Sequence, residues 1–303
     1  MRWTIQDIPD QSGRVAIVTG GNSGIGFETV RGLAERGARV ILACRDESKG
    51  NCARDQILAD CAEADIVVER LDLADLQSVR EFASRVLDNH DRLDLLVNNA
   101  GVMVPPLGRT AEGFELQFGT NHLGHFALTG LLIDRINATP GGRIVIVSSV
   151  AHKFGKVDFD NLNAEKGYKK ARAYALSKLA NLLFQTELQR RLDLAGHGTL
   201  VTAAHPGWTA TNLQAHASTF QFLNPYLAMT PAQGAMPTLF AATSPDAKPA
   251  GYYGPNGLFE MRGAPVEVKP VRAARDQAVA ERLWEVSESL TSVRYLTERA
   301  VAA

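Results

Sequence analysis

The chain has 303 residues, of which 45% are hydrophobic and 21% are charged, and its formal net charge is -1 at pH 7. This composition provides for a packed core, and the length suits one large α/β domain over residues 1–303. A chain with almost no net charge is not attracted electrostatically to a nucleic acid or an anionic membrane, so the composition does not favour either as a partner.

Short β-branched runs alternate with longer helical patterns from about residue 15 to residue 150. This rhythm is typical of βαβ units and a parallel sheet. We expect strands at residues 15–19, 40–43, 66–70, 93–97, 143–148 and 200–204, and a short one near 251–253. Helices are expected at 27–36, around 112–136, at 174–191 and near 276–288. The sequence therefore predicts a single-domain, Rossmann-like, doubly wound parallel sheet flanked by helices.

A glycine-rich loop follows the first predicted strand: Thr19-Gly20-Gly21-Asn22-Ser23-Gly24-Ile25-Gly26. Gly20 permits a tight turn, Gly24 allows backbone to approach a pyrophosphate, and Gly26 lets the helix pack close to the sheet. A phosphate would then lie at a helix N-terminus, where unpaired N–H groups attract it. The strand before the loop and the helix after it predict a dinucleotide site that includes Asn22, Ser23 and Ile25.

The end of the second predicted strand bears on which dinucleotide binds. A carboxylate there would bind the ribose hydroxyls of NAD, whereas a guanidinium can grip the additional phosphate of NADP. Arg45 favours NADP(H) and Asp46 favours NAD(H). In a purely structural alternative, Asp46 caps the next helix and Arg45 is solvated. The spacing favours NADP(H) and leaves NAD(H) open.

Polar residues also end the third and fourth predicted strands. Asp72, followed by Leu73, lies where an adenine would be expected, although Asp72 could equally cap a helix. The sequence Asn98-Asn99-Ala100-Gly101 ends the fourth strand, so its position predicts that it lines the same crevice. Its structural alternative is a polar turn.

Two segments, residues 151–170 and 206–231, break the βα rhythm after predicted strands. Such segments build the binding crevice of an open α/β sheet. We therefore expect the cofactor part at about 14–150, the catalytic and substrate part at about 151–303, and a lid at about 206–231. The lid carries Trp208, Phe220, Phe222 and Tyr226, which suit either a hydrophobic substrate or a core or oligomer contact.

The helix predicted at 174–191 places Tyr174 and Lys178 one turn apart on a shared face. A phenol titrates near pKa 10 and needs a nearby cation, here Lys178 with oxidised nicotinamide, to act as an acid or base at neutral pH. Ser148 and Ser149 end the fifth strand at the edge where a Rossmann crevice holds its ligand. Either hydroxyl could bond a substrate oxygen as charge develops on it, and strand alternation does not choose between them.

Together these motifs resemble those of the short-chain dehydrogenase/reductase family over roughly residues 14–211. The residues concerned are Thr19-Gly20-x-x-x-Gly24-Ile25-Gly26, Asn98-Asn99-Ala100-Gly101, a strand ending in Ser149, and Tyr174-x-x-x-Lys178. Within that family the chain is similar to the retinol dehydrogenase and WW-domain oxidoreductase branch. That similarity rests on Ala43-Cys44-Arg45-Asp46, Asn121-His122-Leu123-Gly124-His125-Phe126, Ser148-Ser149-Val150-Ala151-His152 and Ser177-Lys178-Leu179-Ala180-Asn181.

The resemblance implies an NADP(H)-dependent oxidoreductase that moves a hydride between nicotinamide and a carbonyl/alcohol pair. In it Tyr174 exchanges the proton, Ser149 orients the substrate oxygen, and Asn121 holds a water in a proton relay. Lys178 binds the nicotinamide ribose and lowers the tyrosine pKa.

Further cofactor contacts are implied by the resemblance alone. It places Arg45 at the 2′-phosphate, Asp72 by the adenine and Asn98 by the adenosine ribose. It also places Pro206, Gly207, Thr209 and Thr211 near the carboxamide and diphosphate, with Ala100 and Gly101 in the same crevice. The family further implies a homodimer or homotetramer that pairs the helices around 112–136 and 174–191.

Other features of the sequence limit the location and the alternatives. The first residues lack the apolar core of a signal peptide or anchor, which argues against a retinoid substrate, and no run approaches the roughly 18 apolar residues of a spanning helix. Cys44, Cys52 and Cys61 form no disulfide framework, and His122, His125 and His152 have no zinc-like spacing. We expect a cytoplasmic protein without membrane insertion or metal.

Two other functions compete with the dehydrogenase. A catalytically silent NADP-binding scaffold would be favoured by a missing catalytic residue, but all four positions are filled. A sugar-nucleotide epimerase also uses a Tyr/Lys pair, yet such enzymes usually carry a larger C-terminal substrate domain. The partner we expect is therefore a small carbonyl or alcohol, which we expect to be hydrophobic.

Overall fold

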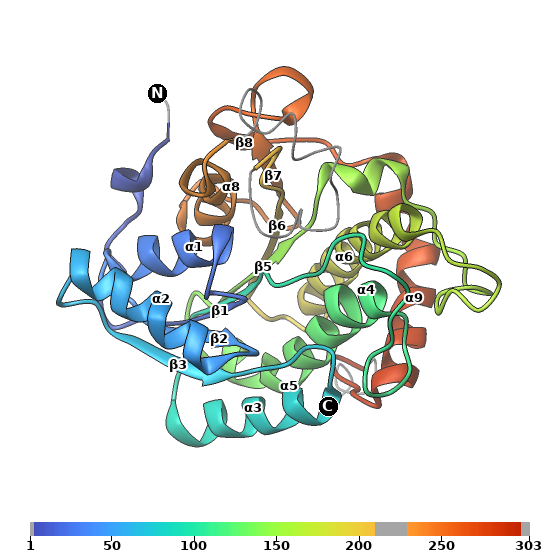
Figure 1. Cartoon of the computed structure of the whole chain (residues 1–303), viewed down its shortest axis with the longest axis horizontal. Helices are drawn as coiled ribbons and strands as arrows, with labels where there is room; N and C mark the ends of the chain where they lie inside the picture. The colour runs from blue at the N-terminus through green and yellow to red at the C-terminus, as the bar shows by residue number, and fades with distance from the viewer. Residues whose placement is uncertain (1–2, 210–228, 298–303) are drawn as a thin grey trace.

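The computed structural model describes residues 3–209 and 229–297. They form one α/β domain around an eight-stranded sheet with the strand order β3-β2-β1-β4-β5-β6-β7-β8 (Figure 1). The strands are β1 (Val15–Thr19), β2 (Arg39–Cys44), β3 (Ile66–Arg70), β4 (Leu95–Asn98), β5 (Arg143–Val147), β6 (Leu200–Ala204), β7 (Tyr252–Pro255) and β8 (Pro265–Glu267). Only β8 pairs antiparallel among these strands. The predicted doubly wound parallel sheet is confirmed.

Helices cover both faces of the sheet because its strands are almost wholly apolar. The longer helices are α1 (Gly24–Ala34), α2 (Glu47–Asp60), α3 (Leu76–Asn89), α5 (Gly124–Ala138), α6 (Lys170–Leu194), α8 (Pro231–Thr243) and α9 (Gln277–Thr291). Short helical segments are η1 (Ile5–Asp7), α4 (Leu116–Phe118), η2 (Gly119–Leu123), η3 (Val150–Phe154), η5 (Leu258–Glu260) and η6 (Arg272–Arg275). Alternate side chains of β1 show the two layers: Ile17 packs with α3, α5 and α6, whereas Val18 packs with α1 and α8.

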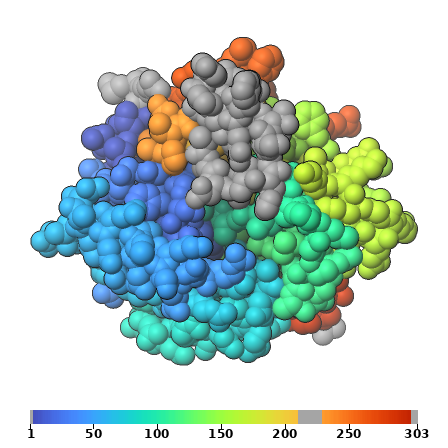
Figure 2. Space-filling view, in the orientation of Figure 1, coloured from blue at the N-terminus to red at the C-terminus, as the bar shows by residue number. Residues whose placement is uncertain are grey.

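The strand order reverses beside β1, which lies between β2 and β4. The chain segments that follow β1 and β4 therefore run to opposite sides of the sheet. Open α/β sheets bind ligands in the crevice between two such segments, at the carboxyl ends of the strands. In Figure 2 the blue surface of the α1–α2 part adjoins the green surface of the α4–α5 part on this face.

Most predicted elements are present with shifted ends. The fourth strand runs over Leu95–Asn98 instead of 93–97, because the Leu93 N–H is bonded to the Thr139 hydroxyl at 3.1 Å before the ladder begins. The helix expected around 112–136 begins at Leu116, after Glu115 caps its first N–H groups. It then passes through the π-helical turn η2 before α5. The edge strand β8 was not predicted, because three residues beginning with a proline give no alternating pattern.

Candidate active site

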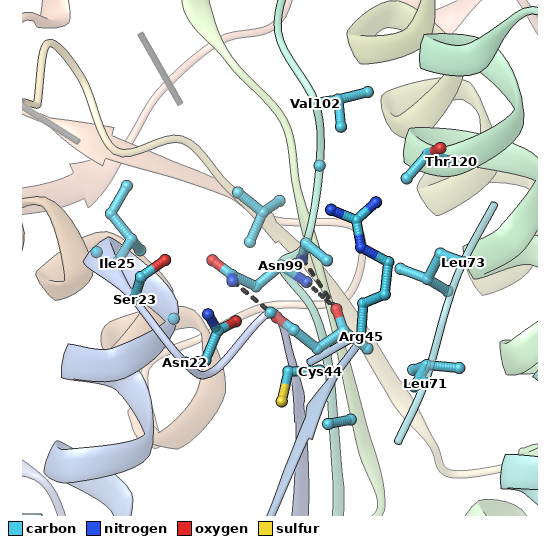
Figure 3. A pocket seen from close by; sticks show the side chains of 18 of the residues that line it. Asn22, Ser23, Ile25, Cys44, Arg45, Leu71, Leu73, Asn99, Val102 and Thr120 are labelled. Carbon is cyan, nitrogen blue, oxygen red and sulfur yellow. Dashed lines mark hydrogen bonds between the residues drawn. The ribbon is translucent and has the colours of Figure 1, made fainter. Parts of the chain in front are cut away.

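A pocket lies at the carboxyl ends of β1, β2, β4 and β5, at the reversal in strand order (Figure 3). It brings together fourteen predicted residues: Gly20, Asn22, Ser23, Gly24, Ile25, Gly26, Arg45, Asp72, Leu73, Ala100, Gly101, Tyr174, Lys178 and Pro206. The remaining residues that line it are Thr19, Ala43, Cys44, Leu71, Asn99, Val102, Thr120, Val147 and Ser148. The glycine loop and the Tyr/Lys helix, about 150 residues apart in sequence, thus face one cavity.

The glycine loop has the shape that a phosphate cradle requires. Gly20 has a φ of 68°, and a Cβ there would lie 3.0 Å from the Cβ of Ala100. A Cβ on Gly26 would collide with the carbonyl oxygen of Gly20. α1 begins at Gly24, and its N-cap Ser23 makes no side-chain cap bond within the described structure. The first N–H groups of α1 are therefore available to an anion in the pocket.

Thr19 fastens the loop to the end of β4. Its hydroxyl oxygen accepts from the N–H groups of Asn99 and Ala100, both at 2.9 Å, and its carbonyl accepts from Asn99 Nδ2 at 2.8 Å. Asn98, predicted to contact the cofactor, is fully buried and donates to Thr129 Oγ1 at 2.9 Å. The Asn98 side chain thus points away from the pocket, whereas Asn99, which belongs to the segment expected to line the crevice, lies in it.

Arg45 and Asp46 separate at the end of β2. The Arg45 side chain extends into the pocket between Asn99 and Leu73 (Figure 3). Asp46 instead caps α2, where its carboxylate accepts from the Lys49 N–H at 3.2 Å and lies 3.5 Å from Lys49 Nζ. Only the guanidinium of this pair lines the pocket.

Asp72 lines the pocket beside Leu71 and Leu73. Its carboxylate accepts from the Ala74 N–H at 3.0 Å, so it stabilises its own turn. The cap of α3 is Asp75, whose side chain accepts from two N–H groups of the first turn. The helix-cap alternative for Asp72 is therefore wrong.

Tyr174 and Lys178 are buried on the pocket side of α6, with Lys178 Nζ 5.8 Å from the centre of the Tyr174 ring. Lys178 Nζ donates to the Val147 carbonyl at 3.2 Å. Burial lowers the pKa of Lys178 to about 8. Burial raises the pKa of Tyr174 to about 12, and a hydrogen bond with Ser149 offsets part of that rise. The protein groups alone therefore keep Tyr174 protonated at neutral pH.

The two serines after β5 have different partners. Ser148 Oγ donates to the Lys178 carbonyl at 2.8 Å, so this hydroxyl joins β5 to α6 although Ser148 lines the pocket. Ser149 Oγ accepts from the Ala151 N–H at 3.2 Å and hydrogen-bonds Tyr174. The structure thus assigns to Ser149 the hydroxyl that faces the phenol, a choice that strand alternation could not make.

Asn121 lies in the π-helical turn η2, behind the pocket. Its Nδ2 donates to the Val102 carbonyl and to Ser177 Oγ, each at 3.0 Å, and its Oδ1 accepts from the Val102 N–H at 2.8 Å. A Cβ on Gly101 would lie 3.0 Å from Asn121 Oδ1 and 3.6 Å from Lys178 Nζ. The missing side chain of Gly101 therefore leaves open the space between Asn121 and Lys178.

The segment after β6 contributes Pro206 to the pocket. The Gly207 N–H donates to His205 Nδ1 at 3.3 Å, and Thr209 Oγ1 donates to the Pro206 carbonyl at 2.9 Å. Gly207 and Thr209 are not among the residues that line the pocket. Thr211 and most of the predicted lid lie outside the described residues.

Within residues 3–209 and 229–297, no three His, Cys, Asp or Glu side chains are grouped closely enough to hold a metal ion. In the same ranges no helix is long and apolar enough to cross a membrane. The residues that line the pocket instead combine helix N–H groups, a guanidinium and a buried phenol/ammonium pair. Such a set suits a phosphorylated dinucleotide beside an acid/base group.

The family described as short chain dehydrogenase matches residues 14–221. Human retinol dehydrogenase 12 is 42% identical over 287 residues, which cover 93% of this chain and 88% of that protein. Human retinol dehydrogenase 11 is 43% identical over 282 residues, which cover 91% of this chain and 85% of that protein.

Solved structures agree with this relationship. An uncharacterized protein from Mycobacterium paratuberculosis is 43% identical and covers 97% of this chain and 99% of its own, with a TM-score of 0.82. A short chain dehydrogenase from Shigella flexneri, complexed with NADP, is 26% identical with a TM-score of 0.65, and covers 82% of this chain and 98% of its own.

Proposed function

Because the chain belongs to the short-chain dehydrogenase/reductase family, in its retinol dehydrogenase branch, we propose that it is an NADP(H)-dependent member acting on a hydrophobic carbonyl or alcohol. As a member it is an oxidoreductase of CH–OH and C=O groups that uses NAD(P). The choice of NADP(H), the substrate class and the roles of the site residues are our proposal.

The observation that carries the cofactor choice is the separation of Arg45 from Asp46. Arg45 lines the pocket, and a guanidinium can bond a phosphate bidentately. The Asp46 carboxylate, which would repel that phosphate, is held at the start of α2. The uncapped start of α1 at Gly24 would hold the diphosphate. The NADP complex of the Shigella flexneri relative supports the same choice.

The proposed chemistry divides among four side chains. Bound nicotinamide would supply or accept the hydride. Tyr174 would donate its phenolic proton to the substrate oxygen in reduction and accept it in oxidation. Ser149 Oγ already accepts from the Ala151 N–H, so its own O–H would be directed to the developing charge on the substrate oxygen. Lys178 would bind the ribose and stabilise the phenolate, and Asn121 would hold the relay water.

A hydrophobic substrate is supported by three large apolar side chains in η3 and η5, two segments of which the first begins directly after Ser149. Phe154, Leu258 and Phe259 are exposed by 84%, 77% and 73%, respectively. Phe154 ends η3, which begins directly after Ser149, and a 3.0 Å ion pair between Lys153 and Glu260 joins η3 to η5. These side chains would form one wall of the substrate opening.

The competing functions receive less support. All four positions of the catalytic set are filled, and Tyr174 and Lys178 are buried against the pocket, which disfavours a silent scaffold.

The division into a cofactor part at about 14–150 and a substrate part at about 151–303 is also proposed. So are a cytoplasmic location, which the three free cysteines suit, and a homodimer or homotetramer.

The test of cofactor choice is a titration with NADPH and NADH, followed by quenching of tryptophan fluorescence. We expect NADPH to bind more tightly than NADH, and Arg45→Ala to weaken NADPH binding by about tenfold or more with little effect on NADH. Arg54→Ala removes the same charge from a residue of α2 paired with Asp55, and should leave both affinities unchanged. Equal binding of the two nucleotides by wild type would overturn the proposal for NADP(H).

A further inference from the structure

His152 holds the main-chain carbonyl of Ser149. The carbonyl oxygen of Ser149 accepts from the His152 N–H at 3.0 Å and lies 2.6 Å from His152 Nδ1. The ring has no exposed surface, so water does not compete for these bonds. The orientation of the catalytic hydroxyl therefore depends on where the His152 ring is held.

The other ring nitrogen fixes the tautomer of His152. The Val271 N–H donates to His152 Nε2 at 3.3 Å, so Nε2 is an acceptor and carries no proton. In the neutral ring the proton must then be on Nδ1, which donates to the Ser149 carbonyl. Tyr252 supports the ring from the side, with its ring centre at 5.5 Å and at 87°, and its hydroxyl 3.4 Å from Nδ1.

We propose that His152 is a positioning residue: the Nδ1–H of its neutral imidazole clamps the Ser149 carbonyl and so aims the Ser149 hydroxyl at the reacting oxygen, while the Val271 N–H keeps the ring proton on Nδ1. This inference rests on the proposed function of Ser149. His152 is not among the residues that line the pocket, and its bond to Ser149 is to the main-chain carbonyl, so it would act through Ser149.

The surroundings of His152 keep the ring in the required state. Burial is the largest influence on the pKa of His152 and lowers it, and the hydrogen bond with the Ser149 carbonyl opposes this by raising it. The charges of His205 and Lys153 lower the pKa further, whereas Glu260 raises it. A second proton would place a donor at Nε2 against the Val271 N–H. A neutral ring can bond both partners, and a charged ring cannot.

Two conservative variants separate the two bonds. In His152→Asn the amide nitrogen takes the place of Nδ1 and can still donate to the Ser149 carbonyl, but nothing reaches Val271. In His152→Gln the longer side chain can reach Val271, and the bond to Ser149 is lost. Both variants lose one buried hydrogen bond, so they should lose similar stability. A role confined to packing predicts that they also behave alike in every other measurement.

We expect different turnover from the two variants. With decanal as the probe carbonyl and NADPH as reductant, kcat of His152→Asn should stay within about threefold of wild type, and that of His152→Gln should fall by about tenfold or more. The Kd for NADPH should be unchanged in both. In a Ser149→Ala background, His152→Gln should lower kcat by less than about twofold, because His152 acts only through the Ser149 hydroxyl. The proposal would be overturned if the loss of kcat in the double variant equalled the product of the two single losses.

Amide hydrogen exchange provides a readout that needs no turnover. Exchange of residues 150–154 should accelerate in His152→Gln and stay as in wild type in His152→Asn, because those N–H groups depend on the Ser149 turn. Equal exchange in both variants contradicts the clamp, whatever the activity. Absence of decanal reduction by wild type that binds NADPH would instead count against the proposed function alone.

Discussion

Ser148 Oγ donates to the carbonyl oxygen of Lys178 at 2.8 Å, and this bond fixes the end of β5 to the middle of α6. The two neighbouring serines therefore have different partners, since the Ser149 hydroxyl bonds Tyr174. The end of β5 is therefore joined to α6 by a hydrogen bond that takes no part in the proposed reaction.

Alanine substitutions should separate the two serines. Ser148→Ala removes a buried hydrogen bond to the Lys178 carbonyl, which keeps its partner within α6, and should lower the free energy of unfolding by about 1 kcal/mol with a small effect on kcat. Ser149→Ala should lower kcat by roughly 100-fold to 1,000-fold with little loss of stability. Denaturant unfolding and steady-state reduction of decanal measure both quantities. A larger loss of kcat in Ser148→Ala than in Ser149→Ala would show that the assignment is reversed.

Gly26→Ala should disrupt the phosphate cradle. Its Cβ would collide with the Gly20 carbonyl, which cannot move without shifting the loop. We expect at least about a tenfold loss in NADPH affinity together with lower stability. Gly198→Ala is the matched control, because a Cβ there meets nothing within 4 Å and its φ is not positive. If Gly26→Ala bound NADPH like the control, the cradle would lie elsewhere.

The buried ammonium of Lys178 makes stability depend on pH. Its pKa is about 8 in the folded protein against an ordinary value of 10.5. Between these values the unfolded chain binds the additional proton, so the free energy of unfolding gains from this group as pH rises from about 8 to about 10.5. Below pH 8 the burial cost of the charge is fully present.

Lys178→Met removes this dependence and should also remove most of the activity. At pH 7 the free energy of unfolding of the variant should exceed that of wild type by up to about 3 kcal/mol, reduced by the contribution of the lost bond to Val147. This difference should shrink as pH rises above 8. Urea unfolding of both proteins at several pH values measures the difference. An advantage that grows with pH would mean that the folded protein raises the Lys178 pKa.

The sequence predicted the fold and most of the pocket because both depend on local patterns. The glycine loop after β1 and the four-residue spacing of Tyr174 and Lys178 place their residues once the strand order is known. The difference between adjacent residues was not available from spacing. That Asn99 and not Asn98 lines the pocket, and that Ser149 and not Ser148 bonds Tyr174, follows from how each strand end enters its loop.

Other features depend on tertiary contacts. The support of Ser149 by His152 involves Val271, which is 119 residues away in the chain. The raised pKa of Tyr174 comes from burial, whereas the sequence predicted that Lys178 and oxidised nicotinamide together lower it. The π-helical turn around Asn121 leaves no signal in the hydrophobic pattern, since every residue of that turn is buried.

Hydride transfer with Tyr174 as the acid can be followed directly with a labelled cofactor. Wild type and Tyr174→Phe should be given NADPH deuterated at the transferable position, with decanal as acceptor, and the alcohol analysed by mass spectrometry. We predict deuterium in the alcohol with wild type, and a rate lower by roughly 100-fold to 10,000-fold in Tyr174→Phe at unchanged NADPH affinity. Equal transfer by both proteins would contradict the role of Tyr174, and NADPH binding without transfer to any carbonyl would contradict the enzyme and leave a binding protein.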